Sequence, residues 1–133
     1  MTLIDTGPLV ALLDRGEADH VRVAKTLGVL PGRLVTTWPV LTEAMYLMHR
    51  AGGWAGQHHL WALVLSERLE VVDLKEVVPR MHVLMAKYQD TPMGLADGSL
   101  VAAAEFTGCH RVFTLDSDFG VYRIHDPAAF DLV

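Results

Sequence analysis

The stretch that decides the fold is MTLIDTGPLVALLD, residues 1–14, in which a short apolar run stops at Asp5 and is followed by Thr6, Gly7 and Pro8. Leu3 and Ile4 are typical of a buried strand, and residues 8–13 are typical of a helix. A carboxylate at the end of a core strand is costly to desolvate unless a cation or several hydrogen bonds meet it. Asp5 is therefore the first candidate for a functional residue.

Length and composition indicate one domain over residues 1–133. The chain has 133 residues, of which 51% are hydrophobic, which suits one sizeable core. Its single cysteine, Cys109, excludes an intramolecular disulfide and a cysteine-based zinc cage. Asp5 and the Gly7-Pro8 pair interrupt any N-terminal export signal, and no stretch reaches the roughly 18 apolar residues of a membrane span. We expect a cytoplasmic protein without a membrane segment.

The formal net charge of −5 argues against a broad basic surface that coats nucleic acid, because such binding uses many lysine and arginine contacts to phosphate. It does not exclude a nucleic-acid substrate. Several of the 16 acidic residues gathered in one metal-binding cleft would leave the remaining surface close to neutral. The distribution of charge therefore matters more than its sum.

Short apolar runs alternate with helical patterns along the whole chain. Strands are expected from residue 3, over 33–37, 69–74 and 111–115, and in a short fifth strand over 121–125. Helices are expected over 8–13, 21–27, about 39–50, 57–67, 77–88 and a buried 94–106, with AGGWAG (51–56), QDTPMG (89–94) and DSDFG (116–120) between elements. This order predicts an α/β fold, a three-layer α/β/α sandwich with a mostly parallel central sheet of about five strands.

Four acidic residues stand where such a sheet binds ligands. Ligands of open parallel sheets lie beyond the carboxyl ends of the strands. Asp5 ends the first strand and Asp116 ends the fourth. Asp97 lies in the first turns of the buried helix, and Glu43 lies near the start of the helix that begins at Pro39. Each also has an ordinary structural interpretation: Asp97 as a helix cap, Glu43 as a solvated helix residue, and Asp116 or Asp118 as a turn residue.

The same motifs carry a family resemblance. LIDTGPLVALLD, the glutamate in WPVLTEAMYLM, GLADGSLVAAAE and VFTLDSDF resemble, in that order, the acidic motifs of PIN-domain nucleases, especially the VapC-like toxins of toxin-antitoxin pairs. The match spans nearly the whole chain. Thr6 and Thr114 stand where that family often carries a hydroxyl. Gly98 departs from the family's usual small residue with a Cβ, and it is expected to loosen the helix start around Asp97.

The resemblance implies a metal-dependent ribonuclease. It makes Asp5, Glu43, Asp97 and Asp116 the catalytic acids, and Asp5, Asp97, Asp116 and Asp118 the metal ligands, with the DSD sequence leaving Asp116 and Asp118 as alternatives for the fourth acid. Mg²⁺ or Mn²⁺ suits this set, because hard cations prefer carboxylate oxygens and water. By the same resemblance Glu43 contacts the metal through water or orients the attacking water. The reaction implied is hydrolysis of an RNA phosphodiester.

The resemblance also implies a homodimer and a small antitoxin partner that covers the cleft and inserts an arginine among the carboxylates. The alternative is a non-catalytic PIN-fold module that acts through a protein partner. The DSD motif also resembles the nucleophile motif of haloacid-dehalogenase-like phosphatases, but it lies too close to the C-terminus for their other elements. A receiver-like domain would need a lysine after a later strand, and no lysine follows Lys87.

Other polar and aromatic residues give weaker signals. His49, His58 and His59 form no metal-binding motif such as HExxH, and a transition-metal site there is not favoured. Trp38, Trp54 and Trp61 are expected in the core or in a subunit interface. Arg15, Arg22, Arg50 and Lys87 contact RNA phosphates if they border the cleft, and are otherwise solvated surface residues.

Overall fold

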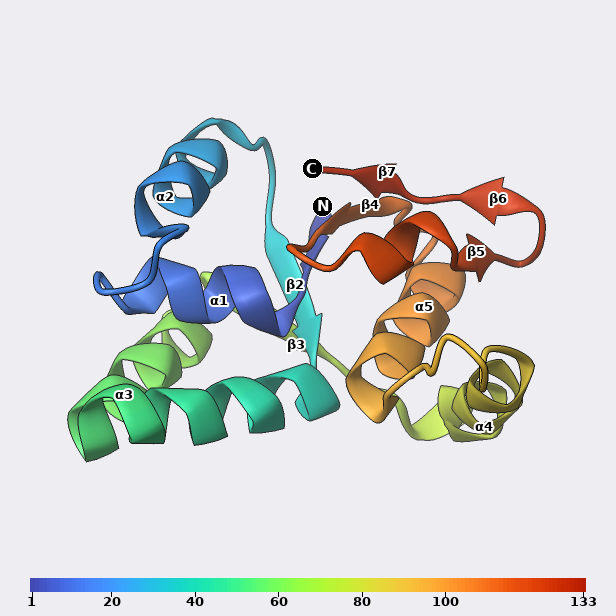
Figure 1. Cartoon of the computed structure of the whole chain (residues 1–133), viewed down its shortest axis with the longest axis horizontal. Helices are drawn as coiled ribbons and strands as arrows, with labels where there is room; N and C mark the ends of the chain where they lie inside the picture. Colours follow the sequence, from blue (N-terminus) through green and yellow to red (C-terminus); the bar gives the residue numbers. More distant parts are fainter.

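Residues 2–4 form the central strand of the sheet, as a computed structural model that describes residues 1–133 shows (Figure 1). The sheet has five strands in the order β3-β2-β1-β4-β7, and all neighbouring strands are parallel. Its strands are β1 (Thr2–Ile4), β2 (Leu34–Thr37), β3 (Leu69–Val72), β4 (Arg111–Phe113) and β7 (Asp131–Leu132). All of β1 is buried, because a parallel sheet is covered on both faces. The predicted parallel α/β fold is confirmed.

The helices form two layers around this sheet. Figure 1 shows α1 (Thr6–Leu13), α2 (His20–Val29) and α3 (Trp38–Leu65) on one side, and α4 (Val78–Lys87) and α5 (Leu95–Thr107) on the other. The chain moves outward from β1 to β3 through α1 to α3, and then returns to β4 through α4 and α5. This reversal of direction places the two groups of helices on opposite faces when parallel strands are joined by the usual right-handed connection. A short 3-10 helix, η1 (Lys75–Val77), precedes α4. Helix α5 is buried over most of its length, as expected for the innermost helix.

Helix α3 consists of two arms joined by a glycine break. Helical geometry is lost at Gly52 and Gly53, and Gly53 has φ 59° and ψ −147°, a conformation that side chains with a Cβ avoid. At Gly56 a Cβ would lie 2.6 Å from the Met48 carbonyl oxygen, so the two arms approach closely there. The predicted helices on either side of AGGWAG are therefore confirmed, and the glycines allow the chain to turn between them.

The C-terminal segment corrects the predicted fifth strand. Residues 121–125 do not join the central sheet: β5 (Arg123–Ile124) pairs antiparallel with β6 (Ala128–Ala129), and β7 is the fifth sheet strand. The predicted DSDFG turn is a short 3-10 helix, η2 (Ser117–Gly120). Ile124 is buried and β5 packs against α5, so apolar burial keeps this strand away from the sheet edge. Positive φ angles at His125 and Asp126 then reverse the chain.

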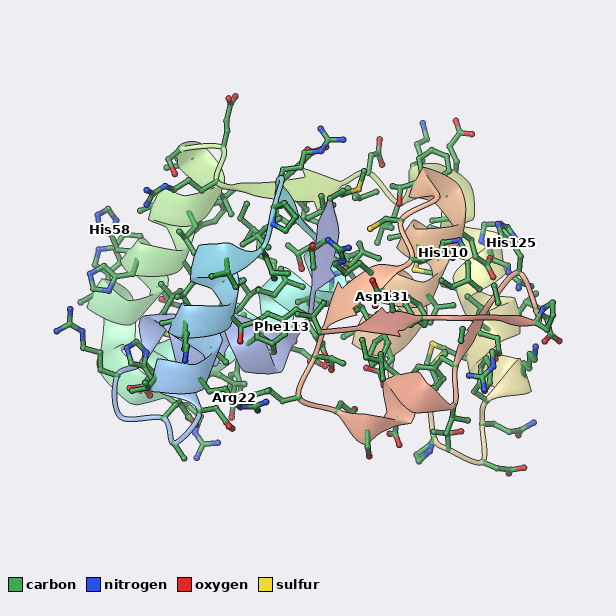
Figure 2. All side chains as sticks on the ribbon, turned by 90° about the horizontal axis from the view of Figure 1, so that it is seen from above. Arg22, His58, His110, Phe113, His125 and Asp131 are labelled. Atoms are coloured by element: carbon green, nitrogen blue, oxygen red, sulfur yellow. The ribbon has the colours of Figure 1, made fainter.

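The exposure of two tryptophans corrects a further prediction. Figure 2 shows Phe113 in the middle of the molecule, and Arg22, His58 and His125 at its periphery. Trp38 and Trp54 are 51% and 65% exposed, so the core interpretation of these two residues is wrong and an interface role is left. No helix is long and apolar enough to cross a membrane.

Candidate active site

An acidic cleft lies at the carboxyl ends of β1 and β4. Its volume is about 490 Å³, and it is lined by Asp5, Thr6, Gly7, Glu43, Asp97, Leu115, Asp116 and Ser117. The four predicted catalytic acids therefore line one cleft, although they lie on segments separated by up to 111 residues of sequence, from Asp5 to Asp116. Asp118 does not line it.

Asp5 has the hydrogen-bond partners that its position at the end of a buried strand requires. It is the N-cap of α1, where its Oδ1 accepts a hydrogen bond of 2.7 Å from the Thr6 amide. Its Oδ2 accepts one of 2.8 Å from the Thr114 hydroxyl, which stands directly after β4. Burial raises the pKa of Asp5, these hydrogen bonds oppose the rise, and the neighbouring charges of Asp116 and Glu43 add to it. Asp5 is therefore a buried carboxylate whose negative charge is only partly compensated by its hydrogen bonds.

Asp97 is placed by the first turn of α5 and is half-buried. Its Oδ2 accepts a hydrogen bond of 3.0 Å from the Tyr122 hydroxyl. Burial raises the pKa of Asp97 to about 6, with further increases from the charges of Asp5 and Asp116, while the Tyr122 hydrogen bond lowers it. Burial and the adjacent Asp97 also raise the pKa of Tyr122 far above its usual value, so the phenol keeps its proton. Asp5 and Asp97 are thus the two acids whose charge is least well compensated by the protein.

Glu43 and Asp116 are the exposed acids of the cleft. Glu43 lies in the second turn of α3, and its Oε2 accepts a hydrogen bond of 3.1 Å from the Thr6 hydroxyl. Asp116 caps η2, where its Oδ1 accepts from the Asp118 amide at 2.9 Å. Asp118 thus supports Asp116 through its backbone, while its own carboxylate lies outside the cleft lining.

Hydroxyl groups link the acids to one another. The Thr114 hydroxyl donates to Asp5 and also accepts from the Asp116 amide at 2.9 Å, so it connects the ends of β1 and β4. Both threonines that the family motif singled out therefore hold a carboxylate. Tyr122 is not predictable from the sequence as part of the site, because residues 121–125 have the pattern of an ordinary strand and no local signal connects Tyr122 with Asp97. Only the packing of this segment against α5 brings the two together.

The donor set suits Mg²⁺ or Mn²⁺ in an open site. No group of three or more histidine, cysteine, aspartate or glutamate side chains is gathered closely enough to hold an ion by itself. Mg²⁺ usually keeps several waters and takes only one or two carboxylates directly, so a cleft of separated oxygen donors fits it. The predicted basic residues do not line this cleft: Arg22 pairs with Asp19 and Lys87 pairs with Asp126.

The prediction that Gly98 loosens the start of α5 around Asp97 is wrong. Its amide donates a regular hydrogen bond of 3.0 Å to the Gly94 carbonyl, and α5 is continuous there. A Cβ at Gly98 would lie 3.3 Å from both Met85 Cγ and Met93 Sδ. The glycine therefore allows close packing of these methionines against α5.

The chain is similar to known VapC proteins and to a chain of a toxin-antitoxin complex. The chain is 27% identical over 115 residues to Ribonuclease VapC26 of Mycobacterium tuberculosis, covering 86% of this chain and 85% of the relative. The crystal structure of Mycobacterium tuberculosis VapC20, a sarcin-ricin loop cleaving toxin, superposes with a TM-score of 0.84 at 20% identity, over 91% of this chain and 94% of that one. A chain of a toxin-antitoxin complex from Klebsiella pneumoniae gives a TM-score of 0.69 at 18% identity over 90% of both chains. No protein-family model matches the sequence.

Proposed function

We propose, from the premise that this chain is a VapC-like PIN-domain protein, that it is a Mg²⁺- or Mn²⁺-dependent endoribonuclease and the toxin of a toxin-antitoxin pair. One observation carries the proposal: Asp5, Glu43, Asp97 and Asp116, which come from four separate segments, line one cleft at the carboxyl edge of the sheet. A purely structural role for each acid would not require them to converge. The ribonuclease name of the VapC26 relative supports the choice of substrate.

Each acid has a distinct part in this proposal. Asp5 and Asp97 hold the metal, because their carboxylates are the most desolvated of the four and neighbouring carboxylates act on both of them. Asp116, as a direct ligand or through water, is the fourth acid in preference to Asp118, which does not line the cleft. Glu43, exposed and held by Thr6, orients the attacking water. A divalent cation held by these acids would supply charge neutralisation at the scissile phosphate and would make the attacking water more acidic.

The charge of the cleft explains why a cation is required. No lysine or arginine lines the cleft, so its carboxylates repel an RNA phosphate when no cation is bound. The residues of the chain then contribute fixed oxygen positions: the threonine and tyrosine hydroxyls orient three of the four carboxylates before the substrate arrives. The proposed enzyme therefore binds metal and RNA together.

The proposal includes a small antitoxin and a homodimer. The similarity to a chain of a toxin-antitoxin complex supports the first, and an acidic cleft is a suitable receptor for an arginine of such a partner. Exposed aromatic residues on the first arm of α3 and just beyond its break, Trp38, Tyr46 and Trp54, support a subunit interface. Sedimentation at micromolar concentration should give a dimer, and a monomer would contradict this part. Because its substrate is RNA, we place the protein in the cytoplasm.

RNA cleavage by the purified chain tests the function. We expect cleavage with Mg²⁺ or Mn²⁺, no cleavage with a chelator, and a loss of at least about 100-fold in Asp5→Asn, since a ligand should matter at least as much as the groups that support it. Asp118→Asn is the matched control and should cleave at nearly the wild-type rate. If the wild type and Asp5→Asn are equally inactive on all RNAs but both bind a partner protein, the non-catalytic binding module is the better description.

A further inference from the structure

Tyr122 is the one tyrosine whose hydroxyl contacts an acid of the cleft. Its hydroxyl donates to Asp97 Oδ2 at 3.0 Å, although Tyr122 itself is fully buried and does not line the cleft. A phenol has a single proton, and here that proton points to the carboxylate. A carboxylate held through one oxygen cannot rotate freely about its Cβ–Cγ bond, so the direction of its other oxygen is set as well.

Tyr122 is itself held in place from two sides. Its ring makes edge-to-face contacts with Tyr88, at a centroid distance of 5.1 Å, and with Phe119, at 5.2 Å. Phe119 in turn packs edge-to-face on Phe130 at 5.5 Å. Such a cluster fixes the ring and with it the position of the hydroxyl. The hydroxyl is therefore a rigid support and not a mobile surface group.

The position of Tyr122 in the chain couples two of the acids. Asp116 is the N-cap of η2, Phe119 lies within η2, and Tyr122 follows after one further residue, Val121. The Tyr122 amide donates to the Asp118 carbonyl at 3.2 Å, which keeps this segment in one piece. The segment that places Asp116 in the cleft therefore also carries the group that orients Asp97, which lies on a different element.

We infer that Tyr122 is a positioning residue of the metal site: its hydroxyl orients the Asp97 carboxylate for a divalent cation held in the acidic cleft. This inference rests on the proposed function. Tyr122 contacts neither substrate nor metal, and it acts through Asp97 alone. In metal sites generally, groups that hydrogen-bond to a metal ligand fix its orientation, and removing such a group typically lowers metal affinity about 10- to 100-fold.

The neighbouring Tyr88 provides a matched control. It belongs to the same aromatic cluster, but its hydroxyl accepts a hydrogen bond from the Arg123 amide at 3.0 Å and touches no acid of the cleft. Tyr122→Phe and Tyr88→Phe each remove one hydroxyl from this cluster and leave the rings. A purely structural role of the cluster predicts the same result for both variants, whereas the positioning role predicts a loss of metal affinity in Tyr122→Phe only.

The full chain is titrated with Mn²⁺ in the absence of RNA, and binding is measured by calorimetry for the wild type and the two variants. We expect Mn²⁺ binding to weaken about 10- to 100-fold in Tyr122→Phe and to stay at the wild-type value in Tyr88→Phe. Wild-type affinity in a folded Tyr122→Phe overturns the inference, and so does an equal loss in both variants. Absence of Mn²⁺ binding by the wild type overturns the proposed metal site and the inference with it.

A second measurement applies if Tyr122→Phe does not fold. The chain is made with 3-fluorotyrosine at position 122 alone, or at position 88 alone as the control, and its fluorine resonance is followed as Mg²⁺ is added. We expect the resonance at position 122 to shift along the binding curve and the resonance at position 88 to stay in place. A resonance at position 122 that does not move while Mg²⁺ saturates the chain overturns the inference.

Discussion

The two walls of the cleft hold their carboxylates in different ways. On one wall, Asp5 is held by the amide of the next residue and by Thr114, which directly follows the adjacent strand β4. On the other wall, Asp97 on α5 is held by Tyr122, from the aromatic cluster behind η2. The first wall depends on strand pairing, and the second depends on how a C-terminal segment packs against a helix.

Removing the metal-binding carboxylate from either wall should abolish the same amount of metal-induced stabilisation. A cation present at 100 times its Kd stabilises the folded wild type by about 2.7 kcal/mol. Asp5→Asn and Asp97→Asn should each lose most of this increment, because each removes a ligand. Thermal unfolding with and without Mg²⁺ measures it, with Asp118→Asn as the control that keeps the increment. If only one of the two variants loses it, the metal is held by one wall alone.

Removal of a hydroxyl should cost more on the strand wall than on the helix wall. Thr114→Val leaves the shape nearly unchanged, but it removes both the donor to Asp5 and the acceptor of the Asp116 amide. The free energy of unfolding should fall by about 2 kcal/mol, since a hydrogen bond contributes about 1 kcal/mol. Tyr122→Phe loses one hydrogen bond and should lose about half as much. Chemical denaturation measures both, and a smaller loss in Thr114→Val would contradict the shared role of its hydroxyl.

The helix wall should make stability depend on pH in the absence of metal. Burial raises the pKa of Asp97 from its ordinary value of 3.8 to about 6, so between these values the folded state binds more protons than the unfolded state. Stability should therefore fall as pH rises from about 4 to about 6, and it should change little above that range. Asp5, whose pKa is also raised by burial, contributes with the same sign.

Asp97→Asn tests this dependence most cleanly. Its amide oxygen still accepts the Tyr122 hydroxyl, and the variant removes a charge that Asp5 and Asp116 repel. We expect the metal-free variant to have a higher Tm than the wild type at pH 7, by a few degrees, and a flatter pH profile. The Tm of Asp5→Asn should rise less, because the NH₂ group of the new asparagine and the Thr114 hydroxyl are both hydrogen-bond donors and cannot satisfy one another. An unchanged pH profile in Asp97→Asn would show that this carboxylate is not the source of the dependence.

The smallest effect is expected next to Asp97, at Gly98. Gly98→Ala gains helix propensity of up to about 1 kcal/mol, but its Cβ must displace Met85 and Met93 by a few tenths of an ångström. Because methionine side chains are flexible, the two effects should nearly cancel, leaving a change below about 1 kcal/mol in denaturation and unchanged Mn²⁺ affinity. A larger loss of stability would show that the methionines cannot move, and a loss of Mn²⁺ affinity would show that the start of α5 had shifted.

The sequence alone was sufficient for features whose cause is local. An apolar strand ending at Asp5, the glycines at 52 and 53, and a helix of small apolar residues after Asp97 are each encoded by residue type and spacing, so the order of elements could be predicted from them. The parallel sheet followed from the alternation of strands and helices. Asp5 and Asp116 stand at strand ends and Glu43 and Asp97 near helix starts, which meet at the carboxyl edge of a parallel sheet, and the family resemblance of their motifs singled out these four acids.

Only the tertiary structure decided how these acids are held and which segment completes the sheet. Asp116 and Asp118 are equivalent in the sequence, but η2 directs the first into the cleft and uses only the backbone of the second. The strand expected over 121–125 lies against α5, where Tyr122 and Ile124 are buried, and β7 pairs with β4 at the sheet edge. The contact between Tyr122 and Asp97 is a consequence of that packing. Burial of apolar surface acts between residues distant in sequence, and no local pattern encodes it.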